Sequence, residues 1–229
     1  GVLGPTSEEP ALSGRRAGRD VTVCASPDEL AACDIGVIVN PNNPTGRIVA
    51  RETLLALARR MRLVVDESFA DFSPGASIAD AAADTGAVVR RSFGKAYALA
   101  GLRLAFAVAP AELAAELRAE MGPWPVSGPA IEIGRQALSD HAWRDAARRR
   151  LAESAGRLDA SLVAAGFEIV GGTSLFRLAA HARAQAIADA LGQAGIHVRR
   201  FSAVPHWLRF GIPADEEWPR VEAALATER

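Results

Sequence analysis

Lysine is almost absent from this chain of 229 residues. Of its 26 basic residues one is a lysine, Lys95, and the others are arginine. Arginine can replace lysine as a solvated charge but not as a nucleophilic amine, because guanidinium keeps its proton in proteins whereas a desolvated lysine can lose it. The surviving lysine therefore predicts covalent chemistry with a carbonyl compound. The alternative is an exposed loop lysine that persists by chance.

Other scarce features exclude classes of function. The net charge is -1 and acids and bases are interspersed, so nothing favours nucleic acid or a membrane surface as a partner. No apolar run approaches membrane-spanning length. Cys24 and Cys33 are the two cysteines, and without a secretion signal they indicate free thiols in a reducing, cytoplasmic compartment. Because the chain opens at Gly1 on what reads as the end of a strand, we expect an internal piece of a longer protein.

Short apolar runs alternate with helical patterns in the first part of the chain. This alternation predicts an α/β fold with a mostly parallel sheet and crossover helices. Residues 4–20 are expected to be polar, turn-rich chain. The expected strands lie at 1–3, 21–24, 36–40, 63–65, 87–89 and 104–109, and the expected helices begin at Ser26 or span 51–61, 111–121 and 128–139.

A long helical pattern over residues 142–165 predicts the exit from this sheet. We expect residues 1–141 to form an incomplete large domain, 142–165 a connecting helix, and 166–229 a small C-terminal α+β domain. The small domain is expected to have strands near 167–170, 175–178, 198–201 and 208–212, a helix at 183–193 and a final helix from Asp215.

Three polar side chains of different chemistry follow successive expected strands. Asn43, Asp66 and Lys95 each come just after a strand, one crossover unit apart. Open parallel sheets bind ligands at the carboxyl ends of their strands, so we expect the three to converge on one crevice. An amine, a carboxylate for a ring nitrogen and an amide for a ring oxygen match the requirements of pyridoxal 5'-phosphate. Ser92 and Arg103, which flank Lys95, are candidates for its phosphate.

Each of these residues has a structural alternative. Asn43 before a proline is also typical of a turn, and Asp66 at a strand end could cap the next helix. Ser92 could be an ordinary strand hydroxyl, and Arg103 could be a surface charge.

Four short motifs in fixed order resemble those of a known enzyme family. They are Asn-Pro-Thr-Gly at 43–46, Asp-Glu-Ser-Phe at 66–69, Ser-Phe-Gly-Lys at 92–95 and Gly-Leu-Arg at 101–103. Together they resemble the pyridoxal-phosphate enzymes of the aspartate-aminotransferase fold, in the branch with histidinol-phosphate aminotransferase and threonine-phosphate decarboxylase. The resemblance implies that Lys95 bonds to the cofactor aldehyde, that Asp66 keeps the ring nitrogen protonated, and that the complete protein is a homodimer.

The resemblance also implies a substrate site on the small domain. Arg209, within Leu-Arg-Phe-Gly at 208–211, resembles the family's carboxylate-binding arginine, and its alternative is an exposed strand arginine. The substrate is expected to be a small amino-acid phosphate. Arg177, Arg199 and Arg200 are candidates for its phosphate by charge alone, and surface arginine is the alternative for each.

Two stretches favour the decarboxylase of cobalamin synthesis. Phe69 stands where the aminotransferases usually carry a tyrosine, and residues 122–129 resemble a tryptophan-containing segment of that decarboxylase. The expected reaction is pyridoxal-phosphate-dependent decarboxylation of L-threonine O-3-phosphate to aminopropanol phosphate. One alternative is an aminotransferase acting on histidinol phosphate or a similar amine. A truncated, inactive fold is another, because Ser7 replaces a ring-stacking tyrosine and the family's first third is missing.

Overall fold

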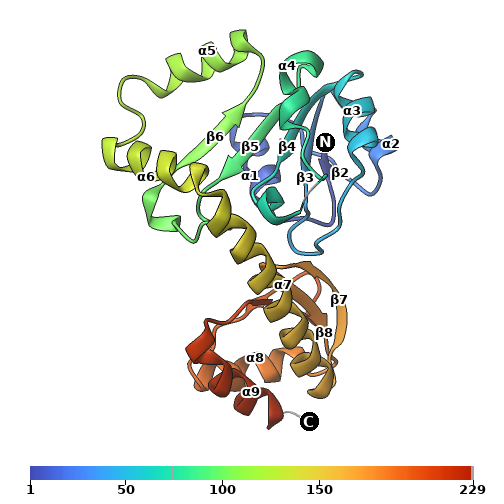
Figure 1. The fold of residues 1–229 in the computed structure, drawn as a ribbon. Coiled ribbons are helices and arrows are strands. Elements are labelled where there is room, and N and C mark those ends of the chain that lie inside the picture. The colour runs from blue at the N-terminus through green and yellow to red at the C-terminus, as the bar shows by residue number, and fades with distance from the viewer. Residues whose placement is uncertain (74, 228–229) are drawn as a thin grey trace. The chain divides into compact units, whose positions relative to one another are not determined.

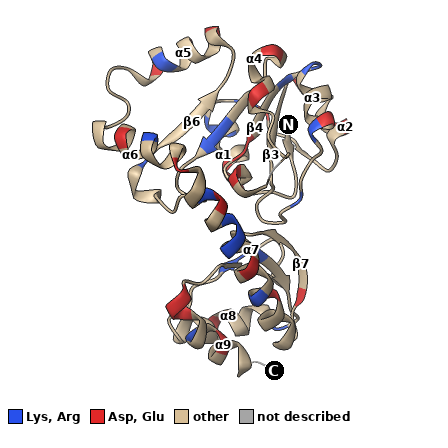
Figure 2. Cartoon of the chain, in the orientation of Figure 1, with Lys and Arg blue, Asp and Glu red and all other residues tan. Residues whose placement is uncertain are grey.

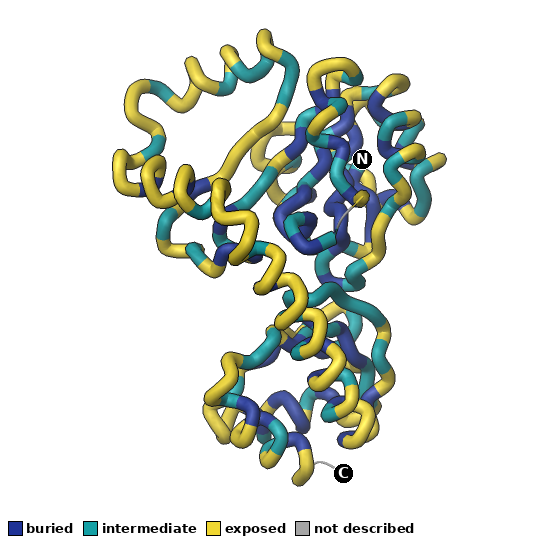
Figure 3. Tube along the Cα trace, in the orientation of Figure 1, coloured by how far each residue is buried: buried dark blue, intermediate teal, exposed yellow. Residues whose placement is uncertain are grey.

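The chain folds into two compact units in a computed structural model that describes residues 1–73 and 75–227. The first unit comprises residues 1–43 and 47–140, and the second comprises residues 44–46 and the chain from His141 onward. Each unit has its own sheet and its own apolar core. Figure 1 shows the path of the chain, and Figure 3 shows that the buried positions concentrate inside each unit.

The first unit is built on a mostly parallel sheet, as the sequence predicts. Within the described residues it has six strands in the order β2-β1-β3-β4-β5-β6. Its strands are β1 (Val2–Leu3), β2 (Val23–Cys24), β3 (Ile35–Val39), β4 (Arg62–Asp66), β5 (Val88–Ser92) and β6 (Ala105–Val108). All neighbours pair in parallel except β5 and β6, which are antiparallel. The chain between β5 and β6 carries only a short 3-10 turn, Ala100–Leu102, and no crossover helix, so it can return only in the opposite direction.

Helices connect the parallel strands of this sheet, and two further helices follow β6. They are α1 (Glu9–Arg16), α2 (Pro27–Leu30), α3 (Arg51–Ala58), α4 (Ala82–Thr85), α5 (Ala111–Met121) and α6 (Gly128–Ser139), with 3-10 turns at Ala70–Phe72 and Ala79–Ala81. The expected α2 start is present, because Ser26 Oγ accepts a hydrogen bond from the Glu29 N–H. The core between sheet and helices includes Leu30, Ile38, Leu54, Leu63, Val65, Ile78 and Val89.

One prediction for this unit is wrong. Residues 4–20 are not simply turn-rich, because α1 lies within them. Charged residues at its ends interact favourably with the helix dipole, because Glu9 lies in the first turn and Arg15 and Arg16 lie in the last. Ala11 is its one buried residue among those described, so the sequence carries no apolar stripe that marks a helix.

The second unit packs helices on an antiparallel sheet. Its elements are α7 (His141–Ala164), β7 (Glu168–Thr173), β8 (Phe176–Ala180), α8 (Ala184–Gln193), β9 (Arg199–Arg200), β10 (Trp207–Gly211), a 3-10 turn (Asp215–Glu217) and α9 (Trp218–Ala226). The strand order is β7-β8-β10-β9. Leu158 and Leu162 of α7 pack with Leu208, Phe210 and Trp218 in its core. The assignment of residues 142–165 as a connector between functional domains stays a prediction.

Gly46 ends the Asn-Pro-Thr-Gly motif in a conformation that favours glycine. Its φ is +72°, and a Cβ at this position would overlap the Gly172 carbonyl group. We expect Gly46→Ala to destabilise the second unit by about 2 kcal/mol or more, since the left-handed conformation alone costs roughly 1–2 kcal/mol. Urea denaturation measures this.

Gly156 provides the matched control for this substitution. It lies inside α7 with open space where a Cβ would be. Gly156→Ala should therefore stabilise by about 0.5–1 kcal/mol, because alanine is the better helix former. Equal effects of the two substitutions would contradict this explanation of the motif.

The surface carries charges of both signs. Figure 2 shows acidic and basic residues interspersed along the helices of both units. Over residues 1–73 and 75–227, none of the helices is sufficiently long and apolar to cross a membrane.

Candidate active site

Five residues predicted from the sequence line one cavity of about 320 Å³ in the first unit: Asn43, Asp66, Ser92, Lys95 and Arg103. Sheet topology explains the convergence. β3, β4 and β5 are parallel neighbours, so their carboxyl ends meet at one edge. Asp66 and Ser92 are the last residues of β4 and β5, while Asn43 and Lys95 lie in the loops that follow β3 and β5.

The loop after β3 contains three asparagines, of which one lines the cavity. Asn40 is fully buried and serves the backbone: its Nδ2 donates to the Ala76 carbonyl at 3.0 Å and its Oδ1 accepts from the Val49 N–H at 2.8 Å. Asn42 Nδ2 donates to the Pro5 carbonyl at 2.8 Å. Asn43 lines the cavity, and its carbonyl accepts from the Thr6 hydroxyl at 3.2 Å. The loop is thus anchored by its first two asparagines and presents the third.

Lys95 stands at the cavity wall as an exposed side chain. Its Nζ lies 5.6 Å from the centroid of the Phe69 ring, which is itself buried. A cation over an aromatic face is weakly attracted to it. In this chain the amine therefore faces solvent on one side and an aromatic ring on the other. It is less desolvated than the sequence argument for a neutral lysine assumes.

Both carboxylate oxygens of Asp66 accept hydrogen bonds. Its Oδ1 accepts from the Ser68 N–H at 3.0 Å and from the Ser68 hydroxyl at 2.5 Å. Its Oδ2 accepts from Arg90 Nη1 at 2.6 Å. The hydrogen bonds to Ser68 form a local turn. The alternative that Asp66 caps the next helix is wrong, because the next helical segment, Ala70–Phe72, has Phe69 at its N-cap and no side-chain cap. The bonds to Ser68 thus occupy Oδ1, whereas Oδ2 points to Arg90 at the cavity wall.

The loop after β5 supplies donors suited to an anion. Ser92 Oγ accepts from the Gly94 N–H at 3.3 Å, which leaves its own hydrogen available to donate. Arg103 is exposed, has a left-handed φ of 55°, and donates to the Ala100 carbonyl at 3.1 Å. A hydroxyl and a guanidinium on one wall are the donor types that bind phosphate.

Sequence reasoning assigned no role to three polar residues that line this cavity: Glu9, Ser68 and Arg90. The sequence did contain a pattern that places Arg90 at the cavity. Arg90 lies two positions before Ser92, and strand side chains two positions apart point to the same face. Arg90 and Ser92 therefore share a face of β5. Glu9 belongs to the helix that the sequence did not predict.

Arg209 lies in the second unit, on β10. Its guanidinium is 5.3 Å from the centroid of the Phe176 ring. Burial lowers the pKa of Arg209, and the positive charge of Arg199, its register partner on β9, lowers it further. Like charges placed opposite each other across a sheet are destabilising, and an anion between them would relieve the repulsion.

The donor set of the first unit fits pyridoxal phosphate. An amine, a carboxylate, an amide, a hydroxyl and a guanidinium match the aldehyde, ring nitrogen, ring oxygen and phosphate of that cofactor. Among the described residues, no group of His, Cys, Asp and Glu could hold a metal ion.

The chain is similar to curated proteins over nearly all of its length. It is 39% identical to the threonine-phosphate decarboxylase of Pseudomonas aeruginosa, over 98% of this chain and 70% of that protein. It is 43% identical to the threonine-phosphate decarboxylase of a Sinorhizobium species, over 93% of this chain and 66% of that protein. The chain thus spans about two thirds of the length of these relatives.

Structural similarity gives the same fold. Histidinol-phosphate aminotransferase from Sinorhizobium meliloti, solved in complex with pyridoxal-5'-phosphate, matches with a TM-score of 0.87 at 21% identity, over 99% of this chain and 69% of that one. The family model for aminotransferase class I and II matches residues 24–225. The resemblance in the sequence motifs is therefore confirmed, and this chain belongs to the aminotransferase class I and II family, whose enzymes depend on pyridoxal phosphate.

Proposed function

We propose that the protein containing this chain decarboxylates L-threonine O-3-phosphate to aminopropanol phosphate with the help of pyridoxal phosphate. The observation that carries this proposal is the identity of 39% and 43% with two threonine-phosphate decarboxylases over 98% and 93% of the chain. The cavity of the first unit supports it with the side chains that the cofactor requires. The proposal includes a step in cobalamin biosynthesis, a homodimer and, given two free thiols, a cytoplasmic location.

The first unit would hold the cofactor. When bound, pyridoxal phosphate supplies an aldehyde that condenses with amines and a ring that accepts electrons from the α-carbon. Lys95 Nζ is the amine that would hold it before substrate arrives, and Asp66 would pair with the ring nitrogen. Asn43 would donate to the ring oxygen, while Ser92 and Arg103 would donate to the phosphate.

The second unit would hold the substrate. Arg209 would bind the substrate carboxylate. Arg199 is our candidate for the substrate phosphate, because Asp159 engages Arg177 at 2.7 Å and Asp189 engages Arg200 at 2.6 Å. After carbon dioxide leaves, Lys95 Nζ or a water delivers a proton to the α-carbon.

Incubating the complete, cofactor-loaded protein with L-threonine O-3-phosphate tests the proposal. We expect carbon dioxide and aminopropanol phosphate in equal amounts, without a keto acid. The Lys95→Ala protein is the control for background decarboxylation. Transfer of the amino group to 2-oxoglutarate would rule out the lyase.

Family membership favours one alternative, an aminotransferase acting on histidinol phosphate or a similar amine. The same residues would serve, with Lys95 Nζ moving a proton from the α-carbon instead of replacing carbon dioxide. An inactive fold remains the other alternative, because Ser7 lines the cavity without offering a ring to stack on the cofactor. Absence of cofactor binding by the complete protein would support that outcome.

A further inference from the structure

Arg90 is a second charged side chain at the carboxylate that would receive the cofactor ring nitrogen. Its Nη1 lies 2.6 Å from Asp66 Oδ2, and both residues line the cavity. Because Oδ1 is taken by the Ser68 N–H and hydroxyl, Oδ2 is the oxygen left for a ligand. A ring nitrogen that pairs with Asp66 must therefore meet Arg90 at the same oxygen.

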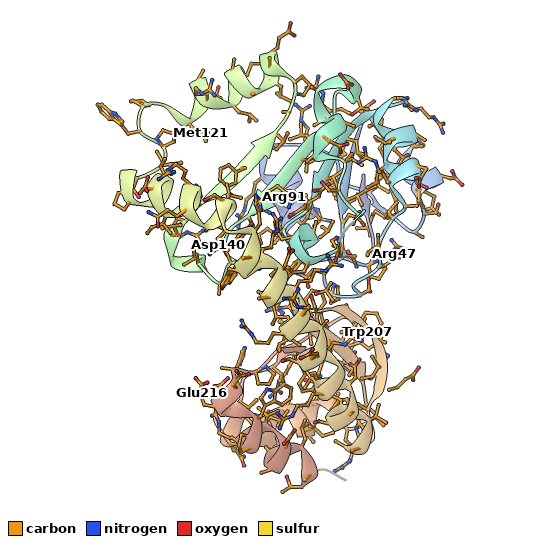
Figure 4. All side chains as sticks on the ribbon, in the orientation of Figure 1. Arg47, Arg91, Met121, Asp140, Trp207 and Glu216 are labelled. Atoms are coloured by element: carbon orange, nitrogen blue, oxygen red, sulfur yellow. The ribbon has the colours of Figure 1, made fainter. Side chains whose placement is uncertain are left out.

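The fold builds this pairing into the sheet. Asp66 and Arg90 are register partners on the parallel strands β4 and β5. Alternation along β5 places Arg90 on the face of Ser92, toward the cavity. It places Arg91 on the opposite face, where Arg91 pairs with Glu67 and Asp71. Figure 4 labels Arg91 among the side chains of the first unit. Two adjacent arginines thus serve different carboxylates.

The consequence is electrostatic. A carboxylate stabilises a protonated ring nitrogen by its negative charge, and a nearby cation opposes that effect. The Asp66 side chain is 18% exposed, so solvent screens its charge poorly, whereas the Arg90 side chain is 56% exposed and reaches it from the cavity rim. With Arg90 in place, the pair presents little net charge to the ring.

We propose that Arg90 is a positioning residue that shares Asp66 Oδ2 with the cofactor ring nitrogen and limits how strongly that nitrogen is protonated. This inference rests on the proposed function, because it requires pyridoxal phosphate at Asp66. With Arg90 present, the cofactor ring would accept electrons less strongly than it would beside an aspartate alone.

Nitrogen-15 NMR of the complete protein, loaded with pyridoxal phosphate labelled at the ring nitrogen, tests the inference. We expect the pH at which the ring nitrogen loses its proton to rise by about one to two units in Arg90→Leu, the size typical of a neighbouring charge. Arg90→Lys, which keeps the cation, should restore the wild-type titration. Arg62→Leu, which removes an exposed arginine from the first position of β4, should leave it unchanged.

The outcomes separate the two proposals. If the wild-type protein binds the cofactor and its ring nitrogen titrates identically in Arg90→Leu, the inference is overturned while the proposed function stands. If the wild-type protein binds no cofactor, both fall. Should Arg90→Leu fail to fold, Arg90→Gln against Arg90→Lys makes the same comparison, and equal titration of those two would likewise overturn the inference.

Discussion

The complete protein carrying Lys95→Arg is expected to lose at least ~10³-fold in turnover while it keeps its fold. Lys95 is exposed and is not part of either core, so its replacement should not affect stability. The substitution preserves the positive charge and removes the nucleophilic amine, because guanidinium does not give up its proton. Loss of one proton-transfer group alone typically costs 10²–10⁴-fold. Steady-state kinetics of carbon dioxide release measure the effect.

The control for this variant is a new lysine at a surface site. Arg118 is a helical residue of α5 outside the cavity, and Arg118→Lys should leave turnover unchanged. A Lys95→Arg protein within tenfold of the wild-type rate would show that the amine does not take part in the reaction. The one lysine of the sequence would then be a loop residue retained by chance.

Arg91→Met is expected to destabilise the first unit by about 3–5 kcal/mol. Arg91 Nη1 lies 3.0 Å from Glu67 Oε2, and its Nη2 lies 2.6 Å from Asp71 Oδ1. The Glu67 side chain is fully buried and that of Asp71 is 8% exposed. Removing one partner of a buried ion pair leaves an uncompensated charge, which typically costs this amount. Urea denaturation followed by circular dichroism measures the loss.

The charges around Arg91 explain why methionine cannot replace it. Burial alone would lower the pKa of Arg91, but the Asp71 and Glu67 carboxylates more than offset this and raise it. Among the described residues, Asp71 Oδ2 has no hydrogen-bond partner, so Asp71 depends on Arg91. Adding Glu67→Gln and Asp71→Asn to Arg91→Met should recover part of the stability, because no uncompensated carboxylate charge is then left buried. If the free energy of unfolding of Arg91→Met alone lies within about 1 kcal/mol of the wild-type value, this explanation is contradicted.

The convergence of the cavity residues was predictable because it follows from topology. Asn43, Asp66 and Lys95 are far apart in the sequence, and each follows an apolar run of the length of a buried strand. Parallel pairing then brings them to one edge of the sheet. Arg103 joins them because the loop after β5 is short and turns back into β6.

What the sequence could not supply is the role of adjacent residues. Arg90 and Arg91 look alike in sequence, and their opposite roles depend on where β5 begins and on its register with β4. The helix α1 was missed because one buried alanine gives no periodic signal. The buried partners of Arg91 come from the segment after β4, whose contacts cannot be read from residue types alone.

Borohydride reduction followed by peptide mass spectrometry shows whether Lys95 bonds to the cofactor. The complete protein, loaded with pyridoxal phosphate, is treated with borohydride. Hydride addition converts any carbon–nitrogen double bond between cofactor and protein into a stable single bond, and the protein is then digested. We expect the added mass of the reduced cofactor on the peptide that contains Lys95 and on no other peptide. An unmodified Lys95 peptide from protein that demonstrably contains cofactor would contradict this expectation.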